Sequence, residues 1–92
     1  MVTKKVTIVN PTGLHMRPVS VFCKEAVKYK SQIFIHFKDG EYNAKSVLSV
    51  LSACVRSGDE IELVCEGSDE NEALADMVSI VETGLGEEIQ KQ

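Results

Sequence analysis

The chain of 92 residues contains no tryptophan, and Phe and Tyr together make up only 5% of it. With so few aromatic rings, an extended surface on which nucleic-acid bases could stack is not expected. The formal net charge of −4 points the same way, because nucleic-acid-binding domains carry an excess of Lys and Arg. We therefore expect no nucleic-acid partner.

Long apolar segments are also missing from the sequence. No apolar run approaches the ~20 residues needed to cross a bilayer. The first residues, Met-Val-Thr-Lys-Lys-Val, are polar and alternating, and lack the apolar stretch of a signal peptide. We expect a cytoplasmic protein without membrane insertion. Its 43% apolar and 26% charged residues are typical of a globular protein, and we expect residues 1–92 to form one domain.

Paired cysteine motifs are absent too. The three cysteines, Cys23, Cys54 and Cys65, include no Cys-x-x-Cys pair and no cluster with the spacing of metal ligands. Each lies in an apolar neighbourhood, so we interpret all three as small buried residues in a reducing compartment. We expect no metal site and no organic cofactor.

The charges are divided unevenly along the chain. Residues 1–45 carry eight Lys or Arg against three acidic residues, for +5, and residues 46–92 carry two basic against eleven acidic residues, for −9. This division is consistent with a positive patch that steers an acidic partner. It is equally consistent with an acidic C-terminal helix beside ordinary surface lysines, and charge alone leaves both open.

Hydrophobic periodicity predicts seven elements. Alternating apolar residues predict strands near residues 4–9, 33–37, 41–44 and 61–65, and helical spacing predicts helices over 18–27, after Ser46, and over about 70–85. Asp39-Gly40 predicts a tight hairpin turn, and Ser68 or Asp69 is the expected cap of the last helix. The order β-α-β-β-α-β-α therefore predicts an α+β fold, with one face of a four-stranded sheet covered by helices.

The two histidines occupy different settings. His36 lies in a predicted strand on the face opposite Ile35 and Phe37, so we expect it on the solvent side. His15 lies between the turn Asn10–Gly13 and the first helix, where backbone N–H groups have no intrahelical acceptor and favour anions. The positive end of the helix dipole disfavours a protonated imidazole there, which leaves a neutral, nucleophilic ring.

This setting suits a phosphoryl group bound covalently to His15. The backbone amides of Met16 and Arg17 and the Arg17 guanidinium would meet the charged product. Each contribution is modest, about 0.3–1 kcal/mol at an exposed site, which fits a carrier that must release what it accepts. On spacing alone, the alternative of a histidine that merely occupies the start of a helix stays open.

The segment Thr12-Gly13-Leu14-His15-Met16-Arg17-Pro18 resembles the active-site segment of HPr, the histidine-containing phosphocarrier family of the bacterial sugar phosphotransferase system. The resemblance continues at Ala44-Lys45-Ser46-Val47-Leu48 and at Gly67-Ser68-Asp69-Glu70. It implies an HPr-like open-faced β-sandwich, with a four-stranded antiparallel sheet in the order 1-4-2-3 and three helices on one face.

The resemblance also implies site residues and partners. His15 would accept a phosphoryl group on Nδ1 from phospho-enzyme I and pass it to sugar-specific enzyme II A domains, with Arg17 stabilising the transferred group. Ser46 matches the serine that an HPr kinase/phosphorylase modifies. The expected docking patch comprises Val47, Leu48 and Leu51, rimmed by Arg17, Lys24 and Lys45. A monomer is expected for this work.

The sequence departs from the family pattern at three positions. Met16 stands where a small residue is usual, and Ser49 and Cys54 stand where glycine is common. Because a cysteine does not readily adopt positive φ, we expect the end of the short helix after Ser46 to be differently shaped. That difference would affect recognition of Ser46 by a kinase more than it would affect His15.

Two other functions are compatible with the sequence. The first is a regulatory HPr paralogue that acts mainly through Ser46 phosphorylation and docking to a transcriptional regulator, with little flux through His15. The presence of both His15 and Arg17 favours the carrier over this alternative. The second is a small ligand-binding α/β protein without phosphate chemistry, which leaves the His-x-Arg-Pro arrangement unexplained.

Overall fold

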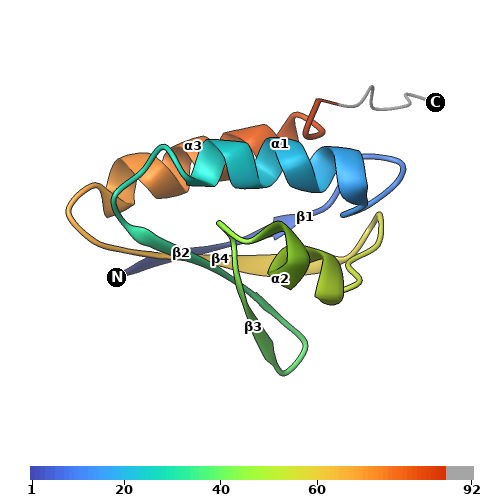
Figure 1. The fold of residues 1–92 in the computed structure, drawn as a ribbon, viewed down its shortest axis with the longest axis horizontal. Coiled ribbons are helices and arrows are strands. Elements are labelled where there is room, and N and C mark those ends of the chain that lie inside the picture. The colour runs from blue at the N-terminus through green and yellow to red at the C-terminus, as the bar shows by residue number, and fades with distance from the viewer. Residues whose placement is uncertain (87–92) are drawn as a thin grey trace.

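A computed structural model describes residues 1–86 of the protein and contains seven elements (Figure 1). The strands are β1 (Val2–Thr7), β2 (Gln32–Phe37), β3 (Gly40–Asn43) and β4 (Glu60–Glu66), and the helices are α1 (Met16–Ala26), α2 (Val47–Ser52) and α3 (Glu70–Glu82). The strands form one antiparallel sheet in the order β1-β4-β2-β3. The predicted α+β class, element order and strand order are confirmed.

The helices and one face of the sheet enclose a single apolar core. Alternate residues of the strands point into it, with Ile33 and Ile35 from β2 and Leu63 from β4 fully buried. Phe22 of α1, Val50 of α2 and Met77 of α3 close the core from the helical side. Figure 1 shows α1 and α3 lying side by side above the sheet, and the shorter α2 packs against α1 and β3. The other face of the sheet carries no helix within residues 1–86.

The hairpin between β2 and β3 turns one residue earlier than predicted. Phe37 pairs with Gly40, so the two turn residues are Lys38 and Asp39, not Asp39 and Gly40. Lys38 adopts a left-handed φ of 54°. The register that pairs Ile35 with Tyr42 keeps the apolar side chains of both strands on the core side, and this pairing sets the turn.

Asp69 begins α3, but its side chain does not cap that helix. Its carboxylate instead accepts hydrogen bonds from the backbone N–H groups of Lys30 and Ser31, both at 2.9 Å, and from the Ser31 hydroxyl. These bonds, the Ser31 hydroxyl first, lower the pKa of Asp69 to about 2. Asp69 thus occupies the N-cap position of α3, as predicted, but its carboxylate makes no capping bond and instead ties the loop after α1 to the start of α3.

The cysteines divide into two environments. Cys23 and Cys65 are buried as predicted, and burial raises the pKa of the Cys23 thiol to about 11 and that of Cys65 in the same direction. Cys54 is exposed, so its predicted burial is wrong. It lies just beyond the C-terminal end of α2, where the chain reverses at the surface.

Candidate functional site

The loop before α1 is a tight turn pressed against another loop. The Gly13 N–H donates to the carbonyl of Asn10 at 3.2 Å, with Pro11 between them at a position that favours turns. Gly13 has a φ of +68°, and a Cβ there would lie 2.8 Å from backbone atoms of residues 55–57. Both the conformation and the close approach therefore require glycine at this position.

His15 is the residue at which this loop becomes a helix. Its backbone is extended, with φ −100° and ψ 178°, and its carbonyl accepts the first helical hydrogen bond from the Val19 N–H at 2.8 Å. The His15 side chain is exposed and makes no capping hydrogen bond. The imidazole is thus accessible to a partner protein at the positive end of α1.

Two backbone donors face outward beside that imidazole. The first-turn amides of a helix have no intrahelical acceptor, and Pro18 has no N–H to offer. Within residues 1–86 the Met16 and Arg17 amides donate to no backbone carbonyl. Arg17 is exposed and forms no ion pair with any described residue. The site therefore combines one nucleophile with backbone and guanidinium donors for an anion.

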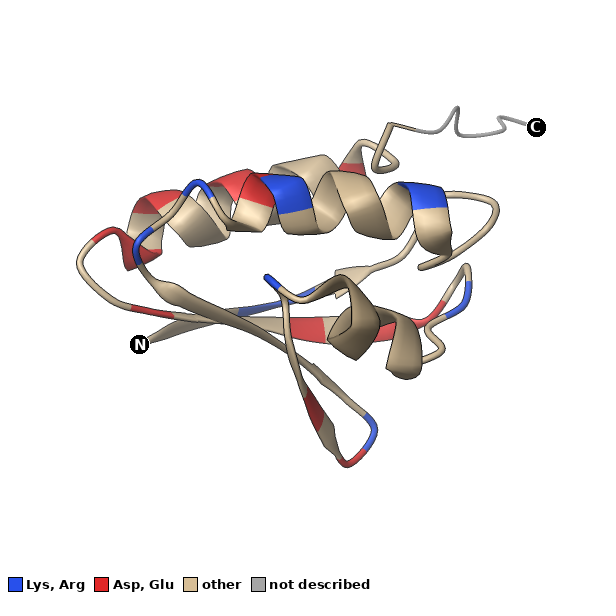
Figure 2. Cartoon of the chain, in the orientation of Figure 1, with Lys and Arg blue, Asp and Glu red and all other residues tan. Residues whose placement is uncertain are grey.

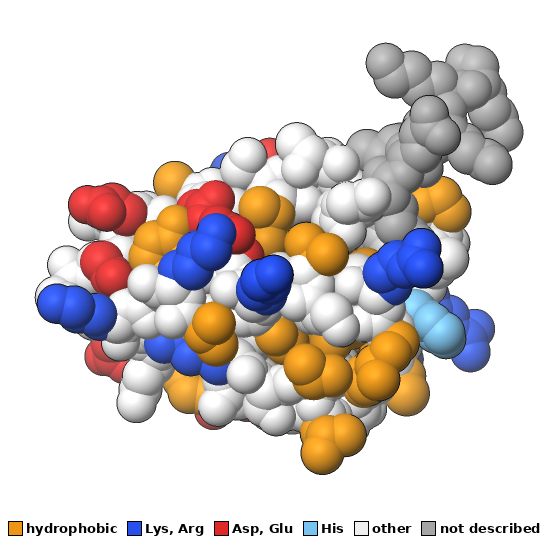
Figure 3. All heavy atoms as spheres, turned by 45° about the horizontal axis from the view of Figure 1, so that its top comes forward, with side chains coloured by type: hydrophobic (Ala, Val, Ile, Leu, Met, Phe, Trp, Pro, Cys, Tyr) orange, Lys and Arg blue, Asp and Glu red, His pale blue; other side chains and the backbone are white. Residues whose placement is uncertain are grey.

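Apolar side chains are exposed next to the histidine end of α1. Leu48 of α2 has 81% of its surface exposed and Met16 has 57%, while Val47 and Leu51 are half-buried. Figure 3 shows hydrophobic side chains gathered at one end of the molecule, beside a histidine and basic side chains. This apolar patch (Met16, Val47, Leu48 and Leu51) is the kind of surface that a docking protein covers.

The basic residues expected around the apolar patch differ in exposure and in hydrogen bonding. Lys24 is exposed in the last turn of α1. Lys45 is half-buried, and its Nζ donates to the carbonyl of Tyr29 at 2.7 Å, which joins the start of α2 to the end of α1. Figure 2 shows basic positions on α1 and acidic positions on α3, where Glu70 and Glu72 occupy the first turn. The Lys45 ammonium is therefore already hydrogen-bonded to another part of the protein.

Ser46 begins α2, and its hydroxyl oxygen accepts a hydrogen bond from the Ser49 N–H at 3.2 Å. The N-cap role that its position predicts is thus present. The Ser49 hydroxyl in turn accepts a hydrogen bond from the backbone N–H of Asn43 at the end of β3, at 2.9 Å. Ser46 is half-buried and lies in a hydrogen-bonded junction of β3 with α2.

The end of α2 corrects an expectation. Cys54 adopts a left-handed φ of 55°, the conformation that glycine supplies without strain, and its N–H donates to the Leu51 carbonyl at 3.2 Å. The helix therefore ends as it would with glycine, and the expected change of shape is wrong. The tertiary contact of Val55 with the His15 loop, where the Leu14 N–H donates to the Val55 carbonyl at 3.0 Å, holds the chain in this path.

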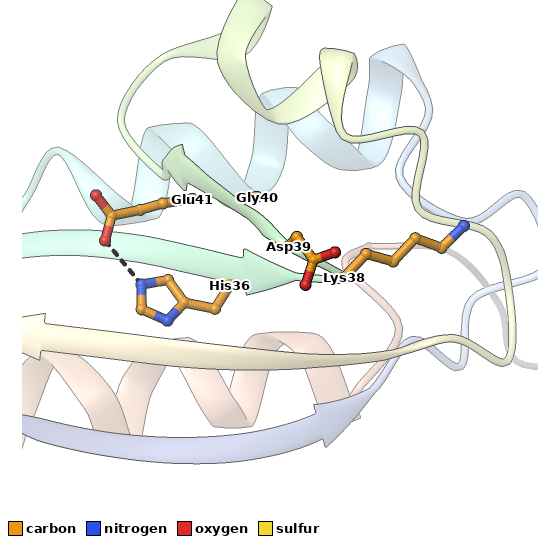
Figure 4. A pocket seen from close by; sticks show the side chains of 5 residues that line it. All are labelled: His36, Lys38, Asp39, Gly40 and Glu41. Carbon is orange, nitrogen blue, oxygen red and sulfur yellow. Dashed lines mark hydrogen bonds and ion pairs between the residues drawn. The ribbon is translucent and has the colours of Figure 1, made fainter.

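The open face of the sheet holds the other histidine of the chain. His36 lies there as predicted, with Nε2 2.8 Å from a carboxylate oxygen of Glu41 and Nδ1 3.7 Å from Glu62. A hollow of about 210 Å³ lies at the β2–β3 hairpin and is lined by His36, Lys38, Asp39, Gly40 and Glu41. Figure 4 shows the His36 ring and the Glu41 carboxylate pointing toward one another there. Residues 1–86 contain no cluster of three His, Cys, Asp or Glu side chains that could hold a metal ion. None of the helices there is long and apolar enough to cross a membrane.

A family model described as "PTS HPr component phosphorylation site" matches residues 2–83. The chain belongs to the HPr family. Among curated relatives, it is 42% identical to the HPr-like protein Crh of Halalkalibacterium halodurans, over 89% of this chain and 98% of that protein. It is 38% identical to the phosphocarrier protein HPr of Mycoplasma genitalium, over 82% of this chain and 86% of that protein.

Solved structures of HPr proteins have the same fold. The crystal structure of an HPr from Thermoanaerobacter tengcongensis superposes with a TM-score of 0.93, at 38% identity over 97% of this chain and all of that one. Bacillus subtilis Crh, described as a dimer with a swapped domain, superposes with a TM-score of 0.74, at 36% identity over 91% of this chain and 97% of that one. The HPr family thus includes both phosphocarriers and HPr-like relatives, some of which crystallise as dimers.

Sequence reasoning identified Asn10 only as part of a turn. In the structure Asn10 is fully buried, and its side-chain amide donates to the Gly13 carbonyl at 2.7 Å. An Asn directly before Pro and three residues before Gly was the available signal, because Asn side chains commonly bond the backbone of the turn they begin. The signal does not reveal burial, which depends on the tertiary packing of this loop.

Proposed function

We propose that this HPr-family protein is a phosphocarrier in which His15 accepts a phosphoryl group from phospho-enzyme I and passes it to enzyme II A domains. The exposed His15 imidazole at the start of α1, with Arg17 in the same helical turn, is the observation that carries the proposal. The carrier works in the cytoplasm as a monomer, because a single exposed face serves each partner in turn.

The proposed transfer uses the lone pair of Nδ1. The Nδ1–P bond forms as the bond from phosphorus to the donor breaks, and the donor keeps the electron pair. The imidazole must be neutral for this attack, because only an unprotonated Nδ1 has a free lone pair. The Met16 and Arg17 amides and the Arg17 guanidinium then bind the phosphoryl oxygens. Each amide contributes about 0.3–1 kcal/mol, so the group remains transferable.

Docking would use the apolar patch and its basic neighbours. Leu48 is the most exposed apolar side chain of the patch, and Arg17 and Lys24 lie on the neighbouring α1 with exposed charges. Positive charges around an apolar centre favour an acidic partner and raise the association rate. Lys45, although part of the expected rim, contributes less because its ammonium binds the Tyr29 carbonyl.

Regulation at Ser46 forms part of the proposal. An HPr kinase/phosphorylase would add about −1.5 to −2 charges at the start of α2, beside the apolar patch. This charge weakens the attraction of the basic rim for an acidic partner, which lowers the association rate.

The second candidate is a regulatory protein that acts mainly through phospho-Ser46. Two relatives at 42% and 40% identity are named Crh, and a solved Crh structure is described as a catabolite repression protein. In this candidate His15 carries little phosphate, and the apolar patch docks a transcriptional regulator. The presence of His15 with Arg17 in its helical turn favours the carrier.

One labelling experiment separates the two candidates. The protein is incubated with phosphoenolpyruvate and enzyme I, and a carrier gains an acid-labile, alkali-stable adduct of about 80 Da within seconds. His15→Ala must lack this adduct, whereas His36→Ala, which removes the other histidine on the far face of the sheet, must retain it. Arg17→Glu is expected to slow the transfer strongly without unfolding the protein. An unlabelled wild-type chain would exclude the carrier.

A parallel reaction with ATP and the kinase tests Ser46. The expected product is an acid-stable adduct that Ser46→Ala lacks and Ser52→Ala retains. Modification of the Ser46→Ala variant would place the regulatory site elsewhere.

A further inference from the structure

Two polar residues are buried in the described part of the chain, Asn10 and Ser31. They lie at opposite ends of the fold, Asn10 in the loop before α1 and Ser31 in the loop after it. Ser31 is held by the Asp69 carboxylate, a contact remote from His15. A buried carboxamide such as that of Asn10 is costly unless its hydrogen bonds are made, so the partner that Asn10 binds shows which structure it supports.

The Asn10 carboxamide binds the carbonyl of Gly13, two residues before His15. The Asn10 side-chain amide donates to this oxygen at 2.7 Å, and the His15 backbone N–H donates to the same oxygen at 3.0 Å. One carbonyl thus joins the buried side chain to the backbone of the proposed phosphoryl acceptor. Two donors on one oxygen leave the peptide between Gly13 and Leu14 a single orientation.

The geometry also determines which amides remain for an anion. Because the His15 N–H points back to the Gly13 carbonyl, the outward donors at the start of α1 are those of Met16 and Arg17. If the Gly13 carbonyl rotated away, the His15 N–H would lose its acceptor and the His15 backbone would turn with it. The placement of both the ring and the two amides therefore depends on the peptide that Asn10 holds.

Backbone contacts hold the same loop from its other side. The Leu14 N–H donates to the Val55 carbonyl, and Gly13 lies against the backbone of residues 55–57. These contacts fix where the loop lies. The side chain of Asn10 supplies a bond of a different kind, because it sets the direction of the one carbonyl that also binds His15.

We propose that Asn10 is a positioning residue for phosphoryl transfer, which acts through the Gly13 carbonyl to orient His15 and the first-turn amides of α1. The proposal rests on the proposed carrier function of His15. A nucleophile must be held within a fraction of an ångström of its productive position, and a displacement of about 1 Å costs up to ~100-fold in rate. Asn10 is fully buried and presents no surface to a partner, so it should affect the reaction and not the encounter.

The test replaces Asn10 and compares the variant with a matched control. Asn10→Leu keeps the branched outline of the side chain but removes the donor, and Asn10→Asp keeps the shape but replaces the donor with a carboxylate. Ser31→Ala removes the other buried polar side chain, on which the site does not depend. For each folded variant, kcat and KM for phosphorylation by phospho-enzyme I are measured, together with global stability and the hydrogen exchange of the Leu14 and His15 amides.

The expected result is a fall in kcat of roughly 10- to 100-fold for both Asn10 variants, with KM for enzyme I within about twofold of wild type. Exchange of the His15 amide should accelerate more than global unfolding explains. Ser31→Ala should lose stability with kcat unchanged. If Asn10→Leu does not fold, Asn10→Asp alone is compared with wild type and with Ser31→Ala.

The proposal is overturned if the Asn10 variants keep a wild-type kcat, or if kcat changes only in proportion to stability, as a purely structural residue would require. A rise in KM with unchanged kcat would also overturn it, because Asn10 would then act on docking. If the wild-type protein accepts no phosphate, the carrier function fails. The exchange of the His15 amide then decides by itself whether Asn10 holds the loop.

Discussion

Replacing Cys54 with glycine should stabilise the protein, although glycine usually destabilises a chain. Cys54 has a φ of 55° directly after α2, a left-handed conformation in which the Cβ of an L-residue crowds the following carbonyl oxygen. Its side chain is exposed, so its removal uncovers little apolar surface. Relief of backbone strain should therefore dominate the effect.

The size of the effect follows from two opposing contributions. The left-handed conformation costs a residue other than glycine about 1–2 kcal/mol. Glycine loses more backbone entropy on folding, which offsets about 0.5–1 kcal/mol of that gain. The net stabilisation of Cys54→Gly therefore falls between zero and about 1.5 kcal/mol. The midpoint of about 0.75 kcal/mol raises the Tm of a chain of this size by roughly 3–6 °C.

Urea unfolding under reducing conditions measures this difference, with Cys54→Ala as the matched control. Alanine removes the thiol but keeps the Cβ, so it should remain strained and gain nothing. If the glycine and alanine variants are equally stable, the strain argument is refuted. If the glycine variant is the less stable of the two, the entropy of the unfolded chain outweighs the strain.

Three further predictions concern stability. Gly13→Ala should destabilise the fold by about 2–5 kcal/mol, because φ is +68° and the new Cβ would lie 2.8 Å from the Val55 carbonyl oxygen. Urea unfolding measures this loss of stability, and a loss below about 1 kcal/mol would contradict the prediction. The Asp69 pKa is about 2 in the fold against 3.8 ordinarily, so its stabilisation is complete above about pH 4 and is lost as pH falls through 2. Acid titration of Asp69→Asn should lack that loss, and identical acid limbs would refute the assignment. Ser46→Ala should cost about 1 kcal/mol through loss of the cap on α2, and Ser52→Ala distinctly less.

Local patterns predicted the elements well because each records its own periodicity. The alternation of Ile33, Ile35 and Phe37 marks a strand with one buried face, and the structure places β2 there. Boundaries were less accurate: β1 covers Val2–Thr7 and not 4–9, and α1 begins at Met16, two residues before the predicted start. Edge strands and first helical turns depend on hydrogen bonds to partners, which alternation does not encode.

The candidate site could be predicted from the sequence because its residues are close together in the chain. His15, Arg17 and Pro18 lie within one helical turn, so their spacing alone places them together at the start of α1. Lys45 was harder, because its binding to the Tyr29 carbonyl joins residues 16 positions apart. Cys54 was misread in both burial and conformation, since its path depends on where Val55 meets the His15 loop.

The sequence by itself determined the order of elements, the face of each strand that is apolar, and a histidine with an arginine at a helix start. Periodicity and adjacency are local properties, and a chain carries them before it folds. The tertiary structure decided which polar groups are buried away from water and which protein groups they hydrogen-bond in its place. Asn10 thus binds the Gly13 carbonyl, and the Asp69 carboxylate binds the loop at Ser31 instead of the first amides of α3. These hydrogen bonds depend on which segments, distant in the sequence, the folded core brings into contact.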